Sequence, residues 1–479
     1  MFDFGGRSDS RRAFKLSEKE KVNPFIFRKH DIRGIWGQDW EAKDAFGIGA
    51  AFATWLRDKG ENKIIVGQDN RLSSEKIFEA FTKGILSVGL DVIDLGVVST
   101  PLIYFSRQFL KIKAAAEITA SHNPAEWNGL KLCYDGKTTI PDTELKEIKA
   151  ILDSAKFSSG FGKIVLQDLK KPYLDSICKS LSSFFPKENT KKIKVVIDSG
   201  NGVGGLFGPE LFRSLGCDVI DIHSRLDGTF PNHEPDPSAG KNMVEICVRV
   251  VQEKADLGIA FDGDMDRVNI VDDKGFTLWG DGLVMFFARD ILKRRPGAKI
   301  IFNSQCSPAV EEDIVAHGGV PHLVATGHGT VAKKLELLEA PFAGEYKGHM
   351  FFSDGYFGFD DALYAAGRFV RILSDLNVPL SQFMCDVPFF RSTGEILVSF
   401  PDDKKFIVEK AVSDALSEKN YVQDLEGDAR IKFDGFNDAW GLVRNSDTMP
   451  YLEVFAWAKS DLDLKKVRDI MMGEVEKYL

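Results

Sequence analysis

The stretch 64–86, IIVGQDNRLSSEKIFEAFTKGIL, contains the pattern that decides the fold class. Its apolar start at 64–66 predicts a buried strand, the polar residues 67–74 predict a loop, and residues 75–86 predict a helix. Strands separated by helices favour α/β units with mixed, largely parallel sheets. Similar apolar runs lie at 195–197, 257–261 and 300–302, and a helix is expected from about Gly208.

The strand–helix pattern occurs three times, from about residues 25, 190 and 295, and predicts three α/β domains of similar build. The last ~90 residues differ, because short strand-like runs with two helical stretches predict an α+β domain. We therefore expect four domains around a central active-site cleft, with the first ~20 residues as a mobile arm. The expected domain boundaries are 1–166, 167–274, 275–387 and 388–479.

The composition is that of an ordinary globular protein. Of the 479 residues, 44% are hydrophobic and 28% charged, which excludes disorder, collagen and coiled coil as the main structure. The net charge of −9 disfavours nucleic-acid binding. The sequence lacks the apolar stretch of a signal peptide or a membrane span. The six cysteines include no CxxC pair, which disfavours a disulfide framework or a zinc site and favours a reduced, cytoplasmic protein.

Residues 119–131, TASHNPAEWNGLK, place a hydroxyl beside an imidazole in a turn-forming context. Ser121 and His122 precede Asn-Pro, and Lys131 follows an Asn-Gly turn that can fold it back. A serine held on a rigid turn near cations can act as a nucleophile or carry a phosphoryl group. The alternative is a serine that caps a helix before a loop.

Residues 261–267, FDGDMDR, follow a predicted buried strand. Asp262, Asp264 and Asp266 repel one another, and a hard divalent cation with oxygen ligands relieves that repulsion. Arg267 adds a guanidinium suited to phosphate and stands where an EF-hand loop would need glycine. The alternative is a solvated acidic turn.

Two further loops carry polar side chains between strand-like runs. The segment GEYKGH at 344–349 can hydrogen-bond sugar hydroxyls through Glu345, although a surface turn is the alternative. The segment RNSDTMP at 444–450 can cradle a phosphate, although an ordinary hairpin loop is the alternative.

A competing pattern is G-x-G-x-x-G at Gly200, Gly202 and Gly205, which follows a predicted strand and has Asp221 about 20 residues later. It favours a dinucleotide-dependent oxidoreductase. However, any tight strand-to-helix turn can use the same glycines, and this reading leaves the serine and triple-aspartate loops unexplained.

The four loops, in this order, resemble those of the α-D-phosphohexomutase family, most closely its bacterial phosphomannomutase/phosphoglucomutase branch. The likeness extends from Phe27 to Trp457. The combination of TASHNP with DGDMDR is its most specific part, and FGFDDA at 357–362 adds to it. In that family the Gly200 turn belongs to the second α/β domain and binds no dinucleotide.

The resemblance implies an enzyme that moves phosphate reversibly between O6 and O1 of a hexose, through a hexose 1,6-bisphosphate that also serves as activator. It implies that Ser121 carries the phosphoryl group and that Mg²⁺ binds this phosphoserine together with Asp262, Asp264 and Asp266. The residues that it implies for proton transfer and charge stabilisation are Arg33, His122, Lys131, Arg267 and His349. The implied substrate-binding residues are Glu345, Lys347, His328, Arg444, Ser446, Asp447 and Thr448.

Four positions depart from the family's usual residues. Lys347 stands where serine is common, Gln305 near a usual lysine, Asp447 where Asn or Gly is usual, and His30 where tyrosine is common. We expect mannose and glucose phosphates as substrates, with Lys347 altering the balance between them. Phosphoglucosamine mutase and a non-catalytic sugar-phosphate sensor are alternatives on the same fold. We expect a monomer or homodimer with no nucleic-acid or membrane partner.

Overall fold

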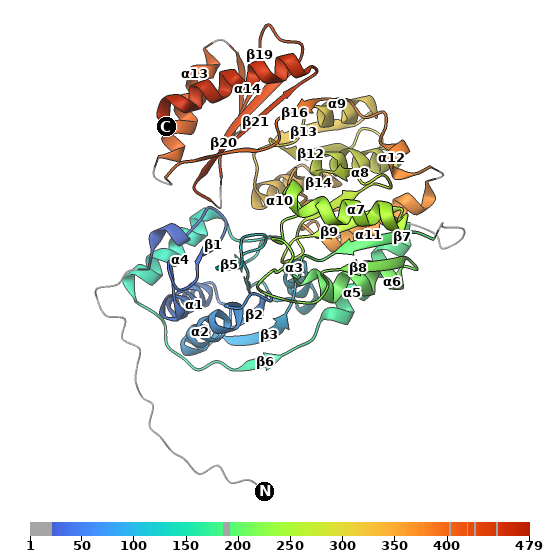
Figure 1. The fold of residues 1–479 in the computed structure, drawn as a ribbon. Helices are drawn as coiled ribbons and strands as arrows, with labels where there is room; N and C mark the ends of the chain where they lie inside the picture. Colours follow the sequence, from blue (N-terminus) through green and yellow to red (C-terminus); the bar gives the residue numbers. More distant parts are fainter. Residues whose placement is uncertain are drawn as a thin grey trace.

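The computed structural model describes residues 22–184, 192–376, 378–401, 404–418, 420–425, 428–446 and 449–479, so the predicted N-terminal arm lies outside it. In this part of the chain, four β-sheets follow one another along the sequence, with helices packed against them (Figure 1). No helix among the described residues is long and apolar enough to cross a membrane.

The first sheet has six strands in the order β1-β5-β4-β2-β3-β6. The strands are β1 (Ile32–Ile35), β2 (Lys63–Gln68), β3 (Asp91–Val97), β4 (Ala115–Ile118), β5 (Trp127–Cys133) and β6 (Ile164–Leu166). Strands β1, β5 and β4 pair antiparallel, and the other pairs are parallel. The helices are α1 (Ala42–Asp58), α2 (Ser74–Val88), α3 (Thr100–Leu110) and α4 (Asp142–Ser154). The strand and helix predicted within 64–86 are β2 and α2.

The second sheet has the order β11-β10-β9-β7-β8 and is also mixed. Its strands are β7 (Lys194–Asp198), β8 (Asp218–Ile222), β9 (Leu257–Phe261), β10 (Val268–Val271) and β11 (Thr277–Leu278). The accompanying helices are α5 (Lys170–Phe184), α6 (Gly204–Ser214) and α7 (Val244–Glu253). The sheet extends past the domain boundary that we expect at 274; the boundaries themselves stay a prediction.

The start of α6 differs from our expectation of about Gly208. The turn is already complete at Gly202, whose amide donates to the Ser199 carbonyl at 2.8 Å. Gly204 and Gly205 therefore occupy the first helical positions instead of extending the loop. Propensity alone argues against glycine in a helix, and tertiary packing overrides it here.

The third sheet has the order β13-β12-β14-β15, with only the last pair antiparallel. Its strands are β12 (Lys299–Asn303), β13 (Val320–Val324), β14 (Phe342–Gly344) and β15 (Met350–Phe352). The helices are α8 (Gly280–Arg294), α9 (Ala309–Ala316), α10 (His328–Leu337), α11 (Ala362–Asp375) and the short α12 (Leu380–Phe383). Helix α11 packs against α5 and α6 of the second domain, so these domains share one apolar core.

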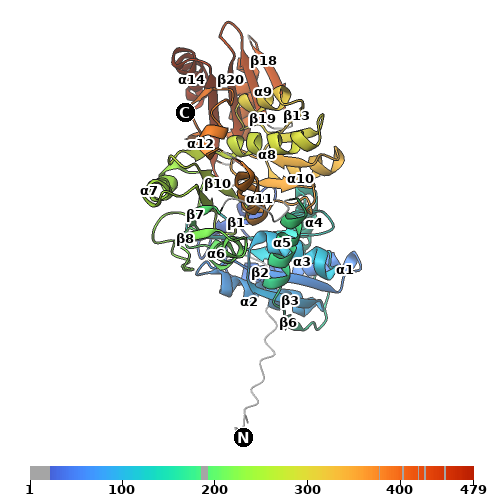
Figure 2. The ribbon, with the colours of Figure 1, turned by 90° about the vertical axis from the view of Figure 1, so that its right-hand side faces the viewer.

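The fourth sheet is antiparallel throughout and, with two helices packed on it, forms the α+β domain that we expect at the C-terminus. Its strands are β16 (Arg391–Ser392), β17 (Ile396–Ser399), β18 (Tyr421–Asp424), β19 (Asp428–Phe433), β20 (Ala439–Asn445) and β21 (Tyr451–Ala458). Helices α13 (Lys405–Ser417) and α14 (Asp461–Val475) pack on it and close a core of its own. This domain lies at one end of an elongated molecule, with the first domain at the other (Figure 2).

Two glycines allow α1 and α2 to pack at very close range. A Cβ at Gly84 would lie 2.1 Å from the Phe46 carbonyl oxygen, and one at Gly49 would lie 2.2 Å from the Phe81 carbonyl oxygen. Real Cβ atoms do not approach backbone this closely, so a side chain at either position would force the helices apart.

We expect Gly84→Ala to destabilise the first domain by roughly 1–3 kcal/mol, because backbone cannot move aside as a flexible side chain can. Gly473→Ala is the matched control: it lies in α14 with nothing within 4 Å of an added Cβ. That change should raise stability by about 0.5–1 kcal/mol. The measurement is the thermal unfolding midpoint of both variants; an unchanged midpoint in Gly84→Ala would contradict the packing.

Candidate active site

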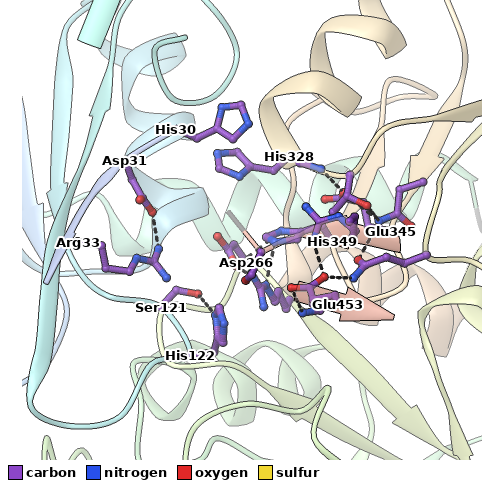
Figure 3. A pocket seen from close by; sticks show the side chains of 18 of the residues that line it. His30, Asp31, Arg33, Ser121, His122, Asp266, His328, Glu345, His349 and Glu453 are labelled. Atoms are coloured by element: carbon purple, nitrogen blue, oxygen red, sulfur yellow. Dashed lines mark hydrogen bonds and ion pairs between the residues drawn. The ribbon is translucent and has the colours of Figure 1, made fainter. Parts of the chain in front are cut away.

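All four domains contribute side chains to one pocket that is open to solvent. It lies where loops at the ends of the sheets converge, and Figure 3 shows side chains from several domains pointing into it. The lining residues include Arg33, Ser121, His122, Lys131, Asp266, Arg267, Gln305, His328, Glu345, Lys347, His349, Arg444, Ser446 and Glu453. The described loops that we predicted from sequence therefore meet at one place.

Ser121 occupies a strained turn directly after β4. Its φ of +51° is in the left-handed region that most side chains avoid. The Ser121 amide donates to Thr119 Oγ1 at 2.8 Å, which fixes the turn. The hydroxyl donates to Asp262 Oδ2 at 2.9 Å and lies 3.1 Å from His122 Nδ1. The serine is thus held between an imidazole and the triple-aspartate loop of the next domain.

Arg71, which our sequence analysis missed, stabilises this turn. Its buried guanidinium donates to four backbone carbonyls of the serine loop, and Asp69 holds it at 3.1 Å. The four carbonyls belong to Ser121, Asn123, Pro124 and Trp127. No local pattern indicates this role, because Arg71 is a single cation in a polar loop and lies 50 residues away from Ser121 in the sequence.

The three aspartates are buried together between β9 and β10. One carboxylate oxygen from each of Asp262, Asp264 and Asp266 lies within 4.8 Å of the others. Burial and the two neighbouring carboxylates raise the pKa of Asp262 well above its usual range. Lys131 on β5 compensates this charge, with Nζ 2.6 Å from both Asp264 Oδ2 and Asp266 Oδ2. From the sequence we expected Lys131 to fold back toward Ser121; in the structure its ammonium group pairs with Asp264 and Asp266.

This loop is suited to a hard divalent cation. Asp264 Oδ1 and Asp266 Oδ1 are buried and have no hydrogen-bond partner among the described residues. A buried carboxylate oxygen without a donor is costly, and a cation at the centre of the three carboxylates would satisfy both oxygens. The all-oxygen ligand set favours Mg²⁺ or Ca²⁺ over transition metals.

Arg267 and His349 connect the metal loop to the third domain. Arg267 Nε donates to His349 Nε2 at 2.8 Å, so the ring proton is on Nδ1, which lies 2.9 Å from Asp360 Oδ2. Burial lowers the pKa of His349, but the Asp266 and Asp360 carboxylates together outweigh it and the pKa is raised. Nε2 therefore accepts a hydrogen bond from Arg267, while Nδ1 faces the Asp360 carboxylate at ion-pair distance. Asp360, at the end of the FGFD segment, is a further residue of this network.

Glu345 presents a buried carboxylate to the pocket. Its Oε1 accepts from the Gly327 amide at 2.9 Å, which positions the side chain. Burial raises the pKa of this carboxyl group. His328 lies nearby at the start of α10, and its Nε2 is 2.8 Å from Thr139 Oγ1 of the first domain. Burial lowers the pKa of His328 well below its ordinary value, so this ring is neutral.

Arg444, at the end of β20, carries the contribution of the fourth domain. Its guanidinium pairs with Glu453 and lies 3.1 Å from Asp428 Oδ1. Ser446 follows in the same pocket, while Asp447 and Thr448 lie outside the described residues. Glu453 is a lone carboxylate within the apolar strand YLEVFAWA, a signal that could have identified it from the sequence.

The glycine pattern after β7 has a structural explanation. A Cβ at Gly202 would lie 2.7 Å from the Gly263 carbonyl oxygen, and one at Gly205 would lie 1.9 Å from that of Ser224. The glycines thus allow backbone segments of the protein to approach one another. Because neighbouring backbone fills this space, the turn offers no cradle for a dinucleotide pyrophosphate.

Three family models match the chain along its first four-fifths. They describe phosphoglucomutase/phosphomannomutase alpha/beta/alpha domains I, II and III, and they match residues 24–159, 171–275 and 279–388. The chain belongs to this family. The resemblance to α-D-phosphohexomutases is therefore confirmed, as are the three α/β domains and the further C-terminal sheet domain.

Individual relatives agree over nearly the whole chain. The phosphomannomutase/phosphoglucomutase of Pseudomonas aeruginosa (strain PAO1) is 36% identical over 456 residues, covering 94% of this chain and 95% of its own. A phosphoglucomutase of Neisseria meningitidis (strain Z2491) is 34% identical, covering 94% and 96%. A solved structure of a phosphoglucomutase/phosphomannomutase family protein from Burkholderia thailandensis has a TM-score of 0.83 and 31% identity, covering 94% and 97%.

Two of the positions that depart from the family pattern meet at the same partner. Lys347 Nζ lies 2.7 Å from Glu395 Oε1 and 3.6 Å from Glu453 Oε1. Gln305 Nε2 donates to Glu453 Oε2 at 2.9 Å. Burial raises the pKa of Glu453, but Arg444 and Lys347 outweigh it and hold the pKa at about 2. Lys347 therefore lines the pocket while pairing with the fourth domain.

We expect Lys347→Ser and Glu395→Gln to act on the same contact. Lys347→Ser leaves Glu395 without its cation, and Glu395→Gln leaves Lys347 with only its longer contact to Glu453. Each single change should therefore lower the unfolding free energy, whereas the double variant should lose no more than the worse single variant. The coupling free energy should be about 1 kcal/mol or more, measured by a double-mutant cycle.

Lys432→Ser is the matched control for this cycle. Its Nζ lies 3.6 Å from Asp438 Oδ1, with both side chains about a third to a half exposed. Surface pairs of this kind contribute little, so the control should change stability by less than about 1 kcal/mol. Additive effects of Lys347→Ser and Glu395→Gln would show instead that Lys347 points to solvent.

Proposed function

We propose that this protein is a phosphohexomutase that interconverts hexose 1-phosphates and hexose 6-phosphates, with mannose and glucose as the sugars. The observation that carries this proposal is the position of Ser121. Its hydroxyl lies 2.9 Å from Asp262 Oδ2, in the same pocket as Arg444 of the fourth domain. Homologues named phosphomannomutase/phosphoglucomutase or phosphoglucomutase support this reading over nearly the whole chain.

The reaction consists of two phosphoryl transfers through one serine oxygen. In the first, the free hydroxyl of the sugar attacks the phosphorus of phosphorylated Ser121; the new P–O bond forms as the bond to Oγ breaks. The product is a hexose 1,6-bisphosphate. After this intermediate reorients, Oγ attacks the phosphorus of its other phosphate; the bond from that phosphorus to the sugar oxygen breaks, the hexose monophosphate leaves, and Ser121 is phosphorylated again. Such transfers depend on positioning and charge neutralisation more than on covalent help from the protein.

Substrate positioning falls to the third and fourth domains. Glu345 would accept hydrogen bonds from two sugar hydroxyls, because a carboxylate only accepts. Arg444 and Ser446, with Asp447 and Thr448 from the same loop, would hold the phosphate that is not reacting. A phosphate competes with Glu453 for the Arg444 guanidinium, whose planar donors suit either anion. His328 would line the pocket between Glu345 and Arg444.

Proton transfer and charge stabilisation fall to groups around Ser121. Burial, with the charges of Arg267 and Arg33, lowers the pKa of His122 well below its ordinary value, so a neutral ring lies 3.1 Å from Ser121 Oγ. Burial lowers the pKa of Lys131, but Asp264 and Asp266 raise it well above its ordinary value. Lys131 would therefore act as an ammonium ion that donates, and His349 would exchange the hydroxyl proton.

The metal of this site would be Mg²⁺, held by Asp262, Asp264 and Asp266 with an oxygen of the phosphorylated Ser121. When bound it supplies positive charge that neutralises the transferring phosphoryl group. Arg267 would add to that charge from the protein itself. Beyond hexose phosphates and the activating bisphosphate we propose no nucleic-acid or membrane partner, a monomer or homodimer, and a cytoplasmic location.

Phosphorylation of Ser121 tests the centre of the mechanism. Mass spectrometry of the active protein should find phosphate on the peptide that contains Ser121. In a coupled assay with glucose or mannose 1-phosphate and catalytic bisphosphate, Ser121→Ala should lower turnover by orders of magnitude, because the phosphoryl carrier is gone. Full activity in this variant would refute the mechanism.

The same assay with glucosamine 1-phosphate and N-acetylglucosamine 1-phosphate tests the sugar. A strong preference for glucosamine 1-phosphate would replace our substrate assignment by phosphoglucosamine mutase and leave the serine chemistry unchanged. Circular dichroism of Ser121→Ala should match the wild type, which separates loss of chemistry from loss of fold.

Metal removal tests the triple-aspartate loop. Excess chelator should abolish turnover, and Mg²⁺ should restore it, because three buried carboxylates and a phosphate repel one another without a cation. Asp264→Asn should raise the Mg²⁺ concentration needed for half-maximal activity, since it removes one charge from the ligand set. Undiminished turnover in chelator would contradict the metal requirement.

A further inference from the structure

A second cluster of metal-ligating side chains lies in the second domain, outside the pocket. One ligand atom from each of Asp198, His223 and His233 lies within 4.8 Å of the others. Asp198 is the last residue of β7, and His223 directly follows the parallel neighbour β8, so both lie at the same edge of the sheet. His233 belongs to the loop that follows. The Asp198 side chain is 1% exposed, and the two rings are 17% exposed or less.

The hydrogen bonds of His233 leave its ring Nε2 facing a carboxylate oxygen of Asp198. Its Nδ1 is 2.8 Å from the Glu234 carbonyl oxygen, and since a carbonyl only accepts, Nδ1 carries the proton. In the neutral ring, Nε2 is then a bare lone pair, yet it lies 3.1 Å from Asp198 Oδ2. Two acceptors this close need a proton or a cation between them. Histidine ligands typically donate their other ring N–H to a carbonyl in this way.

The remaining groups of the cluster are oriented toward the same point. Asp198 Oδ1 accepts from the Gly200 amide at 2.9 Å, which fixes the carboxylate and leaves Oδ2 for the histidines. His223 has a φ of +53°, in the left-handed region, and its ring centroid lies 5.3 Å from that of His233. Its Nε2 lies 3.1 Å from Glu245 Oε2 on the first turn of α7.

We propose that Asp198, His223 and His233 form a binding site for a transition-metal ion of the Zn²⁺ class, with water as the fourth ligand. Two imidazoles and a carboxylate suit Zn²⁺, whereas Mg²⁺ prefers oxygen ligands alone. We therefore expect this site and the triple-aspartate loop to bind different metal ions. The absence of paired cysteines does not exclude zinc here, because none of the three ligands is a cysteine.

The position of the cluster gives the ion a structural role. The segment between His223 and His233 contacts the first domain: Phe230 packs under the Arg71 guanidinium at 5.0 Å. Asn201, next to the cluster, accepts from Asn70 Nδ2 at 2.8 Å through its carbonyl. A cation that joins both ends of this segment to β7 would hold it in place against Arg71, which in turn supports the serine loop. It would stabilise the protein rather than take part in the reaction.

The test measures Zn²⁺ retained by the full chain. Protein is incubated with Zn²⁺ and excess Mg²⁺, desalted, and analysed for metal. The wild type should retain one equivalent more than His223→Asn, a change chosen because asparagine tolerates a left-handed φ. His322→Asn, on β13 of the third domain, is the matched control and should retain as much as the wild type. Mg²⁺-dependent activity of His223→Asn should persist.

A spectroscopic measurement on the wild type makes the result independent of how any variant folds. Co²⁺ in a four-coordinate nitrogen–oxygen site absorbs strongly in the visible, whereas an all-oxygen six-coordinate site absorbs weakly. We expect the strong bands, and their loss when Zn²⁺ is added. Equal Zn²⁺ in the wild type and His223→Asn, or no strong Co²⁺ bands in the wild type, would overturn the proposal and leave a protonated His233 paired with Asp198.

Discussion

Three aspartates buried in one loop are the constraint on which the site depends. Carboxylates removed from water need compensating charge or donors, and the loop itself supplies only backbone amides and Arg267. The main compensation comes from Lys131 of the first domain, whose ammonium lies 2.6 Å from two of the three carboxylates. This buried contact fixes the first domain against the second, and it brings the hydroxyl of Ser121 within hydrogen-bond distance of Asp262.

Charged contacts continue from this loop into the other two domains. Arg267 donates to His349, which lies against Asp360, so the second and third domains meet through one imidazole. Glu453 of the fourth domain then contacts Gln305 and Lys347 of the third domain, and it pairs with Arg444 within its own domain. Buried polar contacts of this kind are costly unless every partner is in place, which favours a single arrangement of the four domains.

The same network bears on the phosphate-binding role that we propose for Arg444. Arg444 is held by Glu453 and lies near Asp428, so its guanidinium is already oriented toward the pocket. In the proposed reaction a phosphate would exchange one anionic partner of Arg444 for another and would not have to order a mobile side chain, which lowers the entropic cost of binding. At this family-variant position, Lys347 directs its charge to Glu395 and Glu453 of the fourth domain.

The sequence by itself determined the fold class and the loops that carry chemistry. Strand–helix alternation is a local property, and Ser121 and the three aspartates stand in short, dense motifs. What it could not show were single residues such as Arg71, Asp428 and Glu395, whose partners lie far along the chain. Only the tertiary structure decided that Lys131 lies on the aspartates and that α6 begins at Gly204. The physical reason is that burial and charge compensation depend on which distant segments meet, and a local pattern carries no record of that.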